Sequence, residues 1–298
     1  MSMKVLNLRK TFGGNTAVSD LSFEMENPGV FGLIGTNGAG KTTTIRMILN
    51  IMPADSGCSS WRGSRITRET LNFGYMPEER GLYMKNKVIE QLIYFGTLRG
   101  MTKSDAKASA LRLMERLGVS EYKDMTAEKL SKGNQQKIQL IATLIHDPVL
   151  IFLDEPFSGL DPVNTETLRE LINELVTEKK YIIMSSHQMP TVEEYCEHLV
   201  LLHRGKTILQ GNLREIKSGY GHTNLILHAE QDVSYFAAQA GLKLKETKAG
   251  ESEYKIKNDD MAKAFLASLV EHDIFPLKYE IKEPSLNEIF IEKVGEEK

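Results

Sequence analysis

The stretch Gly35-Thr36-Asn37-Gly38-Ala39-Gly40-Lys41-Thr42 decides the fold. It follows the apolar run 30–34, which is typical of a buried strand, and precedes a helical run at 43–50. A strand, a glycine-rich turn of the form GxxxxGKT and a helix make a phosphate-binding loop, in which backbone N–H groups and the positive end of the helix dipole face the phosphates. Lys41 is expected to bind the β- and γ-phosphates, and Thr42 to place its hydroxyl on Mg²⁺. Thr43 lies next to them at the helix start.

A second apolar run, 149–153, ends in two acidic residues, Asp154 and Glu155. Ligands of α/β sheets bind at the carboxyl ends of strands, so these carboxylates are expected near the phosphate-binding loop. Asp154 is a candidate Mg²⁺ ligand, directly or through water, because Mg²⁺ prefers oxygen ligands. Glu155 is a candidate general base for an attacking water. Taken alone, the pair could equally be an ordinary solvated loop after a core strand.

Length and composition limit the classes of protein to which this chain can belong. The chain has 298 residues, enough for one large and one small domain, and 41% of them are apolar. Its 37 basic and 40 acidic residues leave a formal net charge of -3, which does not indicate the basic face of a nucleic-acid binder. Cys58 and Cys196 lie far apart without a CxxC pair or a His cluster, so we expect a reducing, cytosolic setting with neither a disulfide framework nor a zinc site.

Nothing in the sequence predicts a membrane span or a secretory signal. The most apolar stretches, 149–153 and 199–202, are far shorter than the roughly 20 residues that cross a bilayer. The N-terminus leads into a strand-like segment without the apolar core and cleavage site of a signal peptide. Any work at a membrane is therefore expected to depend on another chain.

The pattern up to about Gly221 predicts an α/β domain at 1–221. Short β-rich runs alternate with helical patterns, and the evenly apolar runs are typical of strands buried on both faces of a parallel sheet. A helix from Pro162 to Glu178 carries an apolar stripe, and helical segments without strands indicate a helical insertion at about 87–144. The expected strands are 21–25, 30–34, 73–76, 149–154, 182–185 and 199–203.

The sequence pattern of residues 222–298 predicts a second, smaller α+β domain. Its expected elements follow the order β-α-β-β-α-β, the ferredoxin-like signature. A final helix at 285–294 has Ser285 as a candidate N-cap with Glu288 three residues on. The other expected elements are strand 224–229, helix 234–240, strands 242–247 and 253–257, a helix with Ala262, Phe265, Leu266 and Leu269 on one face, and strand 275–281.

The segment Leu130-Ser131-Lys132-Gly133-Asn134 indicates which class of phosphate-binding-loop proteins this chain resembles. A small residue and a glycine that open a helix make a second anion site of exposed N–H groups, although the bare string could also be a helix cap. The segment stands shortly before the run that ends in Asp154 and Glu155. In that position it resembles the ABC ATPase signature LSGGQ. Ser131 and Gly133 are kept, whereas Lys132 and Asn134 replace the usual Gly and Gln.

The resemblance implies roles for four further residues. Phe12, just before Gly13-Gly14, is similar to the aromatic residue that stacks on adenine. Glu78 takes the position of the glutamine that contacts Mg²⁺ and senses the transporter; its carboxylate keeps an oxygen ligand and adds charge. Asp161, in Ser158-Gly159-Leu160-Asp161, resembles the D-loop aspartate, and His187 after Ser185-Ser186 resembles the switch histidine that acts with the catalytic glutamate.

The resemblance covers essentially the whole chain. It implies a P-loop ABC ATPase domain with a mixed sheet core and a helical subdomain, followed by a ferredoxin-like accessory domain. Residues 76–83, the LSKGN form of the signature and residues 283–290 are similar to the NatA-type subfamily, whose members drive exporters of sodium ions, drugs or peptides. The chain is then expected to bind and hydrolyse ATP with Mg²⁺ and to power an exporter. It would act on the inner, cytoplasmic face of the cell membrane, through separate integral membrane subunits.

By the same resemblance, two ATPase subunits, identical or related, face head to tail and trap two ATP molecules. Each ATP would lie between the phosphate-binding loop of one chain and Ser131, Gly133 and Asn134 of the other. Glu155 and His187 would carry hydrolysis, while the helical insertion and the Glu78 loop would pass the motion to the membrane subunits.

Two other classes share part of this pattern. An ABC ATPase of DNA repair or ribosome regulation would carry long coiled coils or two ATPase domains in one chain. A small-molecule kinase would keep the phosphate-binding loop but has no use for the signature helix, D-loop and switch histidine. Residues 223–298 could be a ligand sensor or a dimer brace; since no ligand-binding side chains cluster there in the sequence, we favour the brace.

Overall fold

The computed structural model describes residues 3–67, 70–79 and 81–296, and it divides the chain into two compact units, Met1–Gln210 and Gly211–Lys298. The division falls ahead of the predicted boundary at 221, because helix α7 (Leu213–Tyr220) belongs to the second unit. Asn212 caps this helix by accepting hydrogen bonds from the N–H groups of Arg214 and Glu215, so α7 begins directly where strand β10 (Lys206–Asn212) ends.

The first unit is built on a sheet in the order β10-β9-β3-β8-β7-β6. Strands β9, β3, β8, β7 and β6 run parallel to one another, and β3 and β7 are buried along their whole length, as their evenly apolar sequences predict. A two-residue turn at Arg204 and Gly205 joins β9 to β10, which makes that pair antiparallel and the sheet mixed. The bounds are β3 Gly29–Gly35, β6 Phe73–Met76, β7 Leu150–Asp154, β8 Tyr181–Ser186 and β9 His198–His203.

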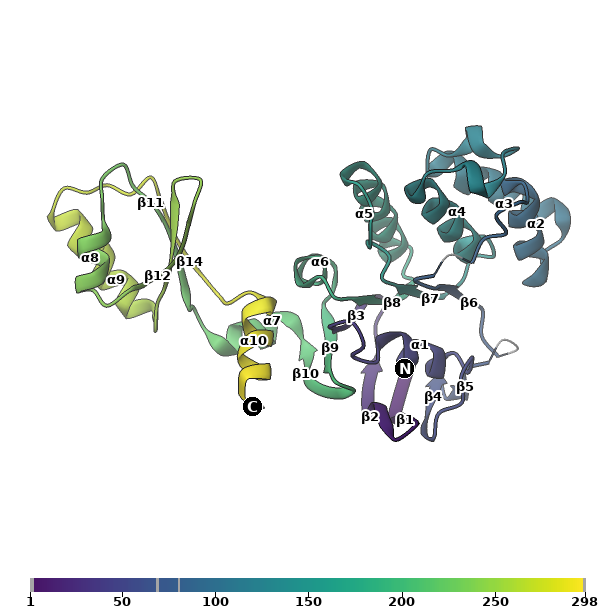
Figure 1. Cartoon of the computed structure of the whole chain (residues 1–298), viewed down its shortest axis with the longest axis horizontal. Helices are drawn as coiled ribbons and strands as arrows, with labels where there is room; N and C mark the ends of the chain where they lie inside the picture. Colours follow the sequence, from purple (N-terminus) through teal and green to yellow (C-terminus); the bar gives the residue numbers. More distant parts are fainter. Residues whose placement is uncertain (1–2, 68–69, 80, 297–298) are drawn as a thin grey trace. The chain divides into compact units, whose positions relative to one another are not determined.

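A second sheet in the first unit is antiparallel, in the order β2-β1-β4-β5. Its strands are β1 (Met3–Phe12), β2 (Asn15–Met25), β4 (Ser56–Trp61) and β5 (Ser64–Arg65). Helix α1 (Lys41–Ile48) lies between the two sheets (Figure 1), and one apolar core joins all three. For this sheet the sequence predicted a strand at residues 21–25 and a strand-like segment at the N-terminus; the other strands were missed because they lack the evenly apolar pattern of the parallel ones.

Helices cover the other face of the main sheet (Figure 1). The predicted helical insertion consists of α2 (Val88–Leu98), α3 (Lys103–Arg116) and α4 (Lys132–Leu144), with 3₁₀ turns at Ser120–Tyr122 and Ala127–Lys129. The predicted helix at 162–178 is α5 (Pro162–Thr177), whose N-cap is Asp161, and α6 (Met189–Tyr195) follows β8.

The second unit has the predicted β-α-β-β-α-β order followed by a helix. Its sheet order β12-β13-β11-β14, with antiparallel neighbours, is ferredoxin-like. The prediction for the last strand was wrong at its start: the strand begins at Lys278, and Phe275 is 81% exposed because the chain leaves α9 through solvent there. The bounds are β11 Asn224–His228, α8 Ser234–Gln239, β12 Lys243–Lys248, β13 Glu251–Lys255, α9 Asp259–Glu271, β14 Lys278–Lys282 and α10 Leu286–Glu296.

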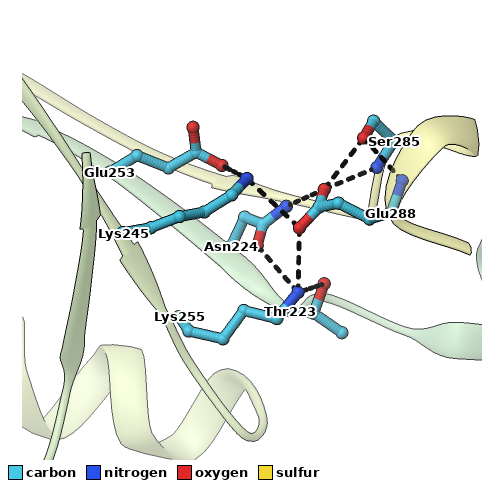
Figure 2. A network of polar contacts seen from close by, with 7 residues as sticks. All are labelled: Thr223, Asn224, Lys245, Glu253, Lys255, Ser285 and Glu288. Atoms are coloured by element: carbon cyan, nitrogen blue, oxygen red, sulfur yellow. Dashed lines mark hydrogen bonds and ion pairs between the residues drawn. The ribbon is translucent and has the colours of Figure 1, made fainter. Parts of the chain in front are cut away.

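Glu288 ties α10 to the sheet of the second unit (Figure 2). The backbone N–H and the hydroxyl of Ser285 donate to its Oε2, and the Glu288 N–H donates back to the Ser285 hydroxyl, which confirms the predicted capping pair. The same carboxylate accepts from Asn224 at 2.9 Å and from Lys255 at 3.0 Å, and it pairs with Lys245 at 3.1 Å. Burial would raise the pKa of Glu288, but these hydrogen bonds outweigh it and lower the pKa to about 2.

Candidate nucleotide-binding and hydrolysis site

The phosphate-binding loop lies between β3 and α1, as the sequence predicted. Gly38 and Gly40 have positive φ angles of 79° and 105°. A Cβ on Gly40 would stand 2.3 Å from the carbonyl oxygen of Ala17, so the loop backbone presses directly against the antiparallel sheet and admits no side chain there. Thr36, Asn37 and Gly38 at its tip are exposed, whereas Ala39 and Lys41 are buried and Thr42 and Thr43 are half-buried.

Lys41 and Glu155 form a buried ion pair at the centre of the site. The Lys41 Nζ lies 3.0 Å from Glu155 Oε1, and the two side chains are 6% and 5% exposed. The same Nζ donates to the carbonyl oxygens of Gly35 at 2.8 Å and Thr36 at 3.3 Å. The lysine is thus held at the loop entrance by groups that a terminal phosphate could replace.

His187 reaches the other oxygen of the same carboxylate. Its Nδ1 lies 2.8 Å from Glu155 Oε2, so the imidazole donates that proton, and its backbone N–H donates to the same atom at 3.4 Å. Glu155 has a φ angle of 51°, a conformation that few non-glycine residues adopt, and its N–H donates to the hydroxyl of Ser185 at 3.0 Å. The segments that follow strands β3, β7 and β8 therefore meet at one carboxylate.

The buried Asp154 carboxylate fits a divalent cation. It is 0% exposed, and its Oδ1 accepts a hydrogen bond from the Ser185 hydroxyl. Its Oδ2 is buried and has no hydrogen-bond partner among residues 3–67, 70–79 and 81–296. Burial raises the pKa of Asp154, and the nearby hydroxyls of Ser185 and Thr42 oppose this increase. A cation beside Oδ2 would favour the ionised form and satisfy that oxygen.

A fuller protein cage for the ion is absent: within the described part of the chain, no group of three or more His, Cys, Asp or Glu side chains could hold a metal. Mg²⁺ in nucleotide sites needs only one or two carboxylates besides waters and phosphate oxygens. The donor set of Asp154 and the Thr42 hydroxyl therefore suits Mg²⁺ together with a nucleotide.

The predicted residues of the signature segment lie at the start of α4, away from the phosphate-binding loop in the sequence and on a different element (Figure 1). The Ser131 hydroxyl caps the helix by accepting from the Asn134 N–H at 3.3 Å. A Cβ on Gly133 would stand 2.3 Å from the amide nitrogen of Asn164 and 3.5 Å from Asp161 Oδ2. Within one chain, the segment therefore neighbours the predicted D-loop residue Asp161.

Two further predicted residues are exposed. Phe12 ends β1 and is 46% exposed, with the Lys10 ammonium 5.5 Å from its ring centre. Glu78 follows β6, the strand that pairs with β7, and is also exposed. Gln139 of α4 holds its loop by donating to the carbonyl oxygens of Pro77 and Glu79.

Ser185 is a site residue that the sequence reasoning missed. Its hydroxyl joins the Asp154 carboxylate to the Glu155 backbone. The available signal was its position at the end of a buried strand, two residues before His187.

Comparison with known proteins identifies the family. Residues 18–158 match the family described as ABC transporter, and residues 211–294 match the ATP-binding protein DrrA1-3-like C-terminal domain. An uncharacterized ABC transporter ATP-binding protein of Bacillus subtilis, YhaQ, is 45% identical over 97% of this chain and 97% of its own length. The chain belongs to the ABC transporter ATP-binding proteins. Members of this family bind ATP and hydrolyse it to drive transport, in concert with membrane transporter subunits.

Other relatives agree with this assignment. The linearmycin resistance ATP-binding protein LnrL of Bacillus subtilis is 30% identical over 97% of each chain. The ABC transporter ATP-binding protein NatA of the same organism is 36% identical over 67% of this chain and 83% of its own. A solved ATP-binding subunit of an ABC transporter superposes with a TM-score of 0.67 at 29% identity, over 74% of this chain and 93% of its own. The predicted P-loop ABC ATPase fold is confirmed, and in the described part of this ATP-binding protein no helix has the length and apolar character to cross a membrane.

Proposed function

We propose that this ATP-binding protein hydrolyses ATP at Glu155 and thereby powers an exporter. The observation that carries the proposal is the buried Glu155 carboxylate, which contacts Lys41 through one oxygen and His187 through the other. A carboxylate in this position can accept a proton from water beside the terminal phosphate. The phosphate-binding loop and Lys41 would bind the β- and γ-phosphates, and Phe12 would stack on the adenine ring.

His187 and Lys41 have separate tasks in this mechanism. The His187 imidazole donates to Glu155 Oε2, which orients the carboxylate and leaves its charge available for the proton of the attacking water. Lys41 exchanges its contact with Glu155 Oε1 for the phosphates, so the base becomes free when the nucleotide binds. Thr42 and Asp154, with Glu78 as a further oxygen ligand, would hold Mg²⁺, which supplies positive charge to the phosphate oxygens.

The second ATPase subunit, a copy of this chain or a related one, would complete the site. The exposed Ser131 and the N–H groups at the start of α4 would form an anion site for the nucleotide that the other subunit binds. Head-to-tail pairing would set Ser131, Gly133 and Asn134 against the nucleotide on the partner's loop, with Asp161 beside them. Two anion sites would then share one ATP, which acts as the contact between subunits.

A hollow in the first unit suits the membrane subunits. It measures about 810 Å³ and lies between β6, α2 and α4, where Leu82, Phe95 and Leu98 line it. Leu98 is 63% exposed, and Tyr83 and Tyr94, 50% and 47% exposed, stand nearby in contact with Phe95. Exposed apolar side chains around a hollow are typical of a protein interface. Polar side chains of α4 and of the neighbouring loops also line the hollow, so a short segment of the membrane subunit with both apolar and polar side chains would fit here, next to the Glu78 loop that Gln139 holds.

Export is favoured by the relatives. LnrL is named for resistance to linearmycin, and the second unit matches a DrrA1-3-like domain. Together with the NatA-type sequence features, these names support a drug, peptide or ion as cargo and a location on the cytoplasmic face of the cell membrane. The second domain predicted from the sequence, residues 222–298, would brace the ATPase pair. None of the relatives named above is described as a DNA-repair protein or as a kinase.

The substitution Glu155→Gln tests the proposed base. The amide keeps the size of the side chain but cannot accept the proton, so hydrolysis should fall by a factor of about 10² or more. ATP is then bound without being consumed, and light scattering should detect a dimer with ATP that is absent with ADP. Glu170→Gln, which removes an exposed carboxylate of α5, serves as the control and should hydrolyse at the wild-type rate. Wild-type turnover by Glu155→Gln would refute the catalytic assignment.

A further inference from the structure

His187 is only partly covered by its surroundings. Its side chain is 37% exposed, and it contacts Glu155 Oε2 through its Nδ1 and its backbone N–H. The residue lies in the link between β8 and α6, and its contact bridges to a different strand, β7. The attachment of α6 to the rest of the first unit therefore bears on where His187 lies.

The end of α6 is attached at two points. Cys196, directly after the helix, lies so close to β3 that a Cβ on Gly32 would stand 3.0 Å from its Sγ. Tyr195, the last residue of α6, stacks on Phe157 with ring centres 5.2 Å apart and an angle of 16° between the planes. Phe157 lies two residues after Glu155, in the loop that leads to Asp161.

Arg169 of α5 also contacts Tyr195, the second attachment point of α6. Its Nε donates to the Tyr195 hydroxyl at 2.8 Å, and its guanidinium pairs with Glu194 at 3.0 Å and Glu166 at 3.3 Å. Arg169 and Glu194 are 37% and 41% exposed on their side chains, so water screens their ion pair and it contributes little. The half-buried Tyr195, with one bond from Arg169 and one ring contact to Phe157, is the firmer part of the attachment.

We propose that Tyr195 and Arg169 are positioning residues for ATP hydrolysis: they clamp α6 to the loop after Glu155 and so keep His187 in contact with the base. This inference rests on the proposed role of Glu155 and His187. It also joins the D-loop, on which Asp161 lies, to the histidine through Phe157 and Tyr195. A displacement of the D-loop by the partner subunit would then reach His187 through α6.

A double-mutant cycle in the full chain tests the clamp. Tyr195→Phe keeps the ring on Phe157 and removes only the hydroxyl that Arg169 contacts. We expect kcat for ATP to fall by about tenfold, since small misplacements of catalytic groups are costly, while KM for ATP stays unchanged. In a His187→Ala background the same substitution should cause no further fall, because the clamp acts through His187. Tyr181→Phe, at the opposite end of β8, is the control and should leave kcat unchanged.

Nuclear magnetic resonance adds a measurement that needs no turnover. The ¹⁵N shifts of the His187 imidazole in the ATP-free chain should report a protonated Nδ1, and Tyr195→Phe should reduce the share of that form. An unchanged kcat in Tyr195→Phe, or an equal loss with and without His187, would overturn the clamp alone. A His187→Ala chain with wild-type kcat would instead overturn the proposed catalytic role of the histidine, and the clamp with it.

Discussion

The buried pair of Lys41 and Glu155 can be tested by substituting methionine for the lysine. Lys41→Met keeps the aliphatic stem and removes the charge. Glu155 Oε1 is buried, and apart from the ion pair with Lys41 it has no polar partner in the described residues, so it would then face no cation. Removal of one partner from a buried ion pair typically costs about 3–5 kcal/mol. We expect the lower end, about 3 kcal/mol, because His187 still donates to Oε2.

Thermal unfolding can measure this loss in the ATP-free chain. For a unit of this size, 1 kcal/mol corresponds to about 2–4 °C in Tm, so the expected decrease is about 6–12 °C. The protein has a single tryptophan, Trp61, which is 7% exposed and lies in the first unit, so its fluorescence reports the unit that contains the pair.

The double variant Lys41→Met with Glu155→Gln separates the ion pair from a general packing effect. With the carboxylate of Glu155 neutralised, the charge that Lys41 balanced is gone, and we expect the double variant to recover about 2 kcal/mol relative to the sum of the single losses. A Lys41→Met chain with wild-type Tm, or strictly additive losses, would refute this reasoning. ATP should raise the Tm of the wild type by mass action but not that of Lys41→Met, because the terminal phosphates lose their cation.

Three further predictions concern other parts of the chain. A chain cut after Gly221 should retain a cooperatively unfolding, ATP-binding first unit, because β10 is complete at that point; a broad, non-cooperative melt would contradict the boundary. Phe12→Ala should weaken ATP binding by about tenfold in a direct titration, the usual scale of a lost base stack, and an unchanged affinity would exclude stacking. Glu288→Gln should destabilise the second unit by up to about 3 kcal/mol in hydrogen exchange at pH 7. In the wild type this stabilisation is complete above the ordinary pKa of 4.5 and is lost as the pH falls toward 2, since the folded pKa lies below the unfolded one.

The sequence alone determined those features that are encoded locally. The phosphate-binding loop, the buried strand before Asp154 and Glu155, the helical insertion and the Ser285–Glu288 cap each depend on residues close together in the chain. The order of elements in the second unit followed in the same way from short apolar patterns. Turn residues, apolar periodicity and helix caps depend on a few neighbouring residues, so they can be recognised in the sequence without a structure.

Only the tertiary structure decided which distant residues meet. Strands β7 and β8 are neighbours in the sheet, and this brings His187 and Ser185 to Glu155. No local sequence pattern predicts which strands are neighbours in a sheet. Most of the antiparallel sheet that supports the phosphate-binding loop escaped prediction for the same reason, since its strands are stabilised by pairing and by one buried face. The contact of Tyr195 with Arg169 and Phe157 joins three elements whose sequences carry no common signal, because it depends on the packing of helices against the completed sheet.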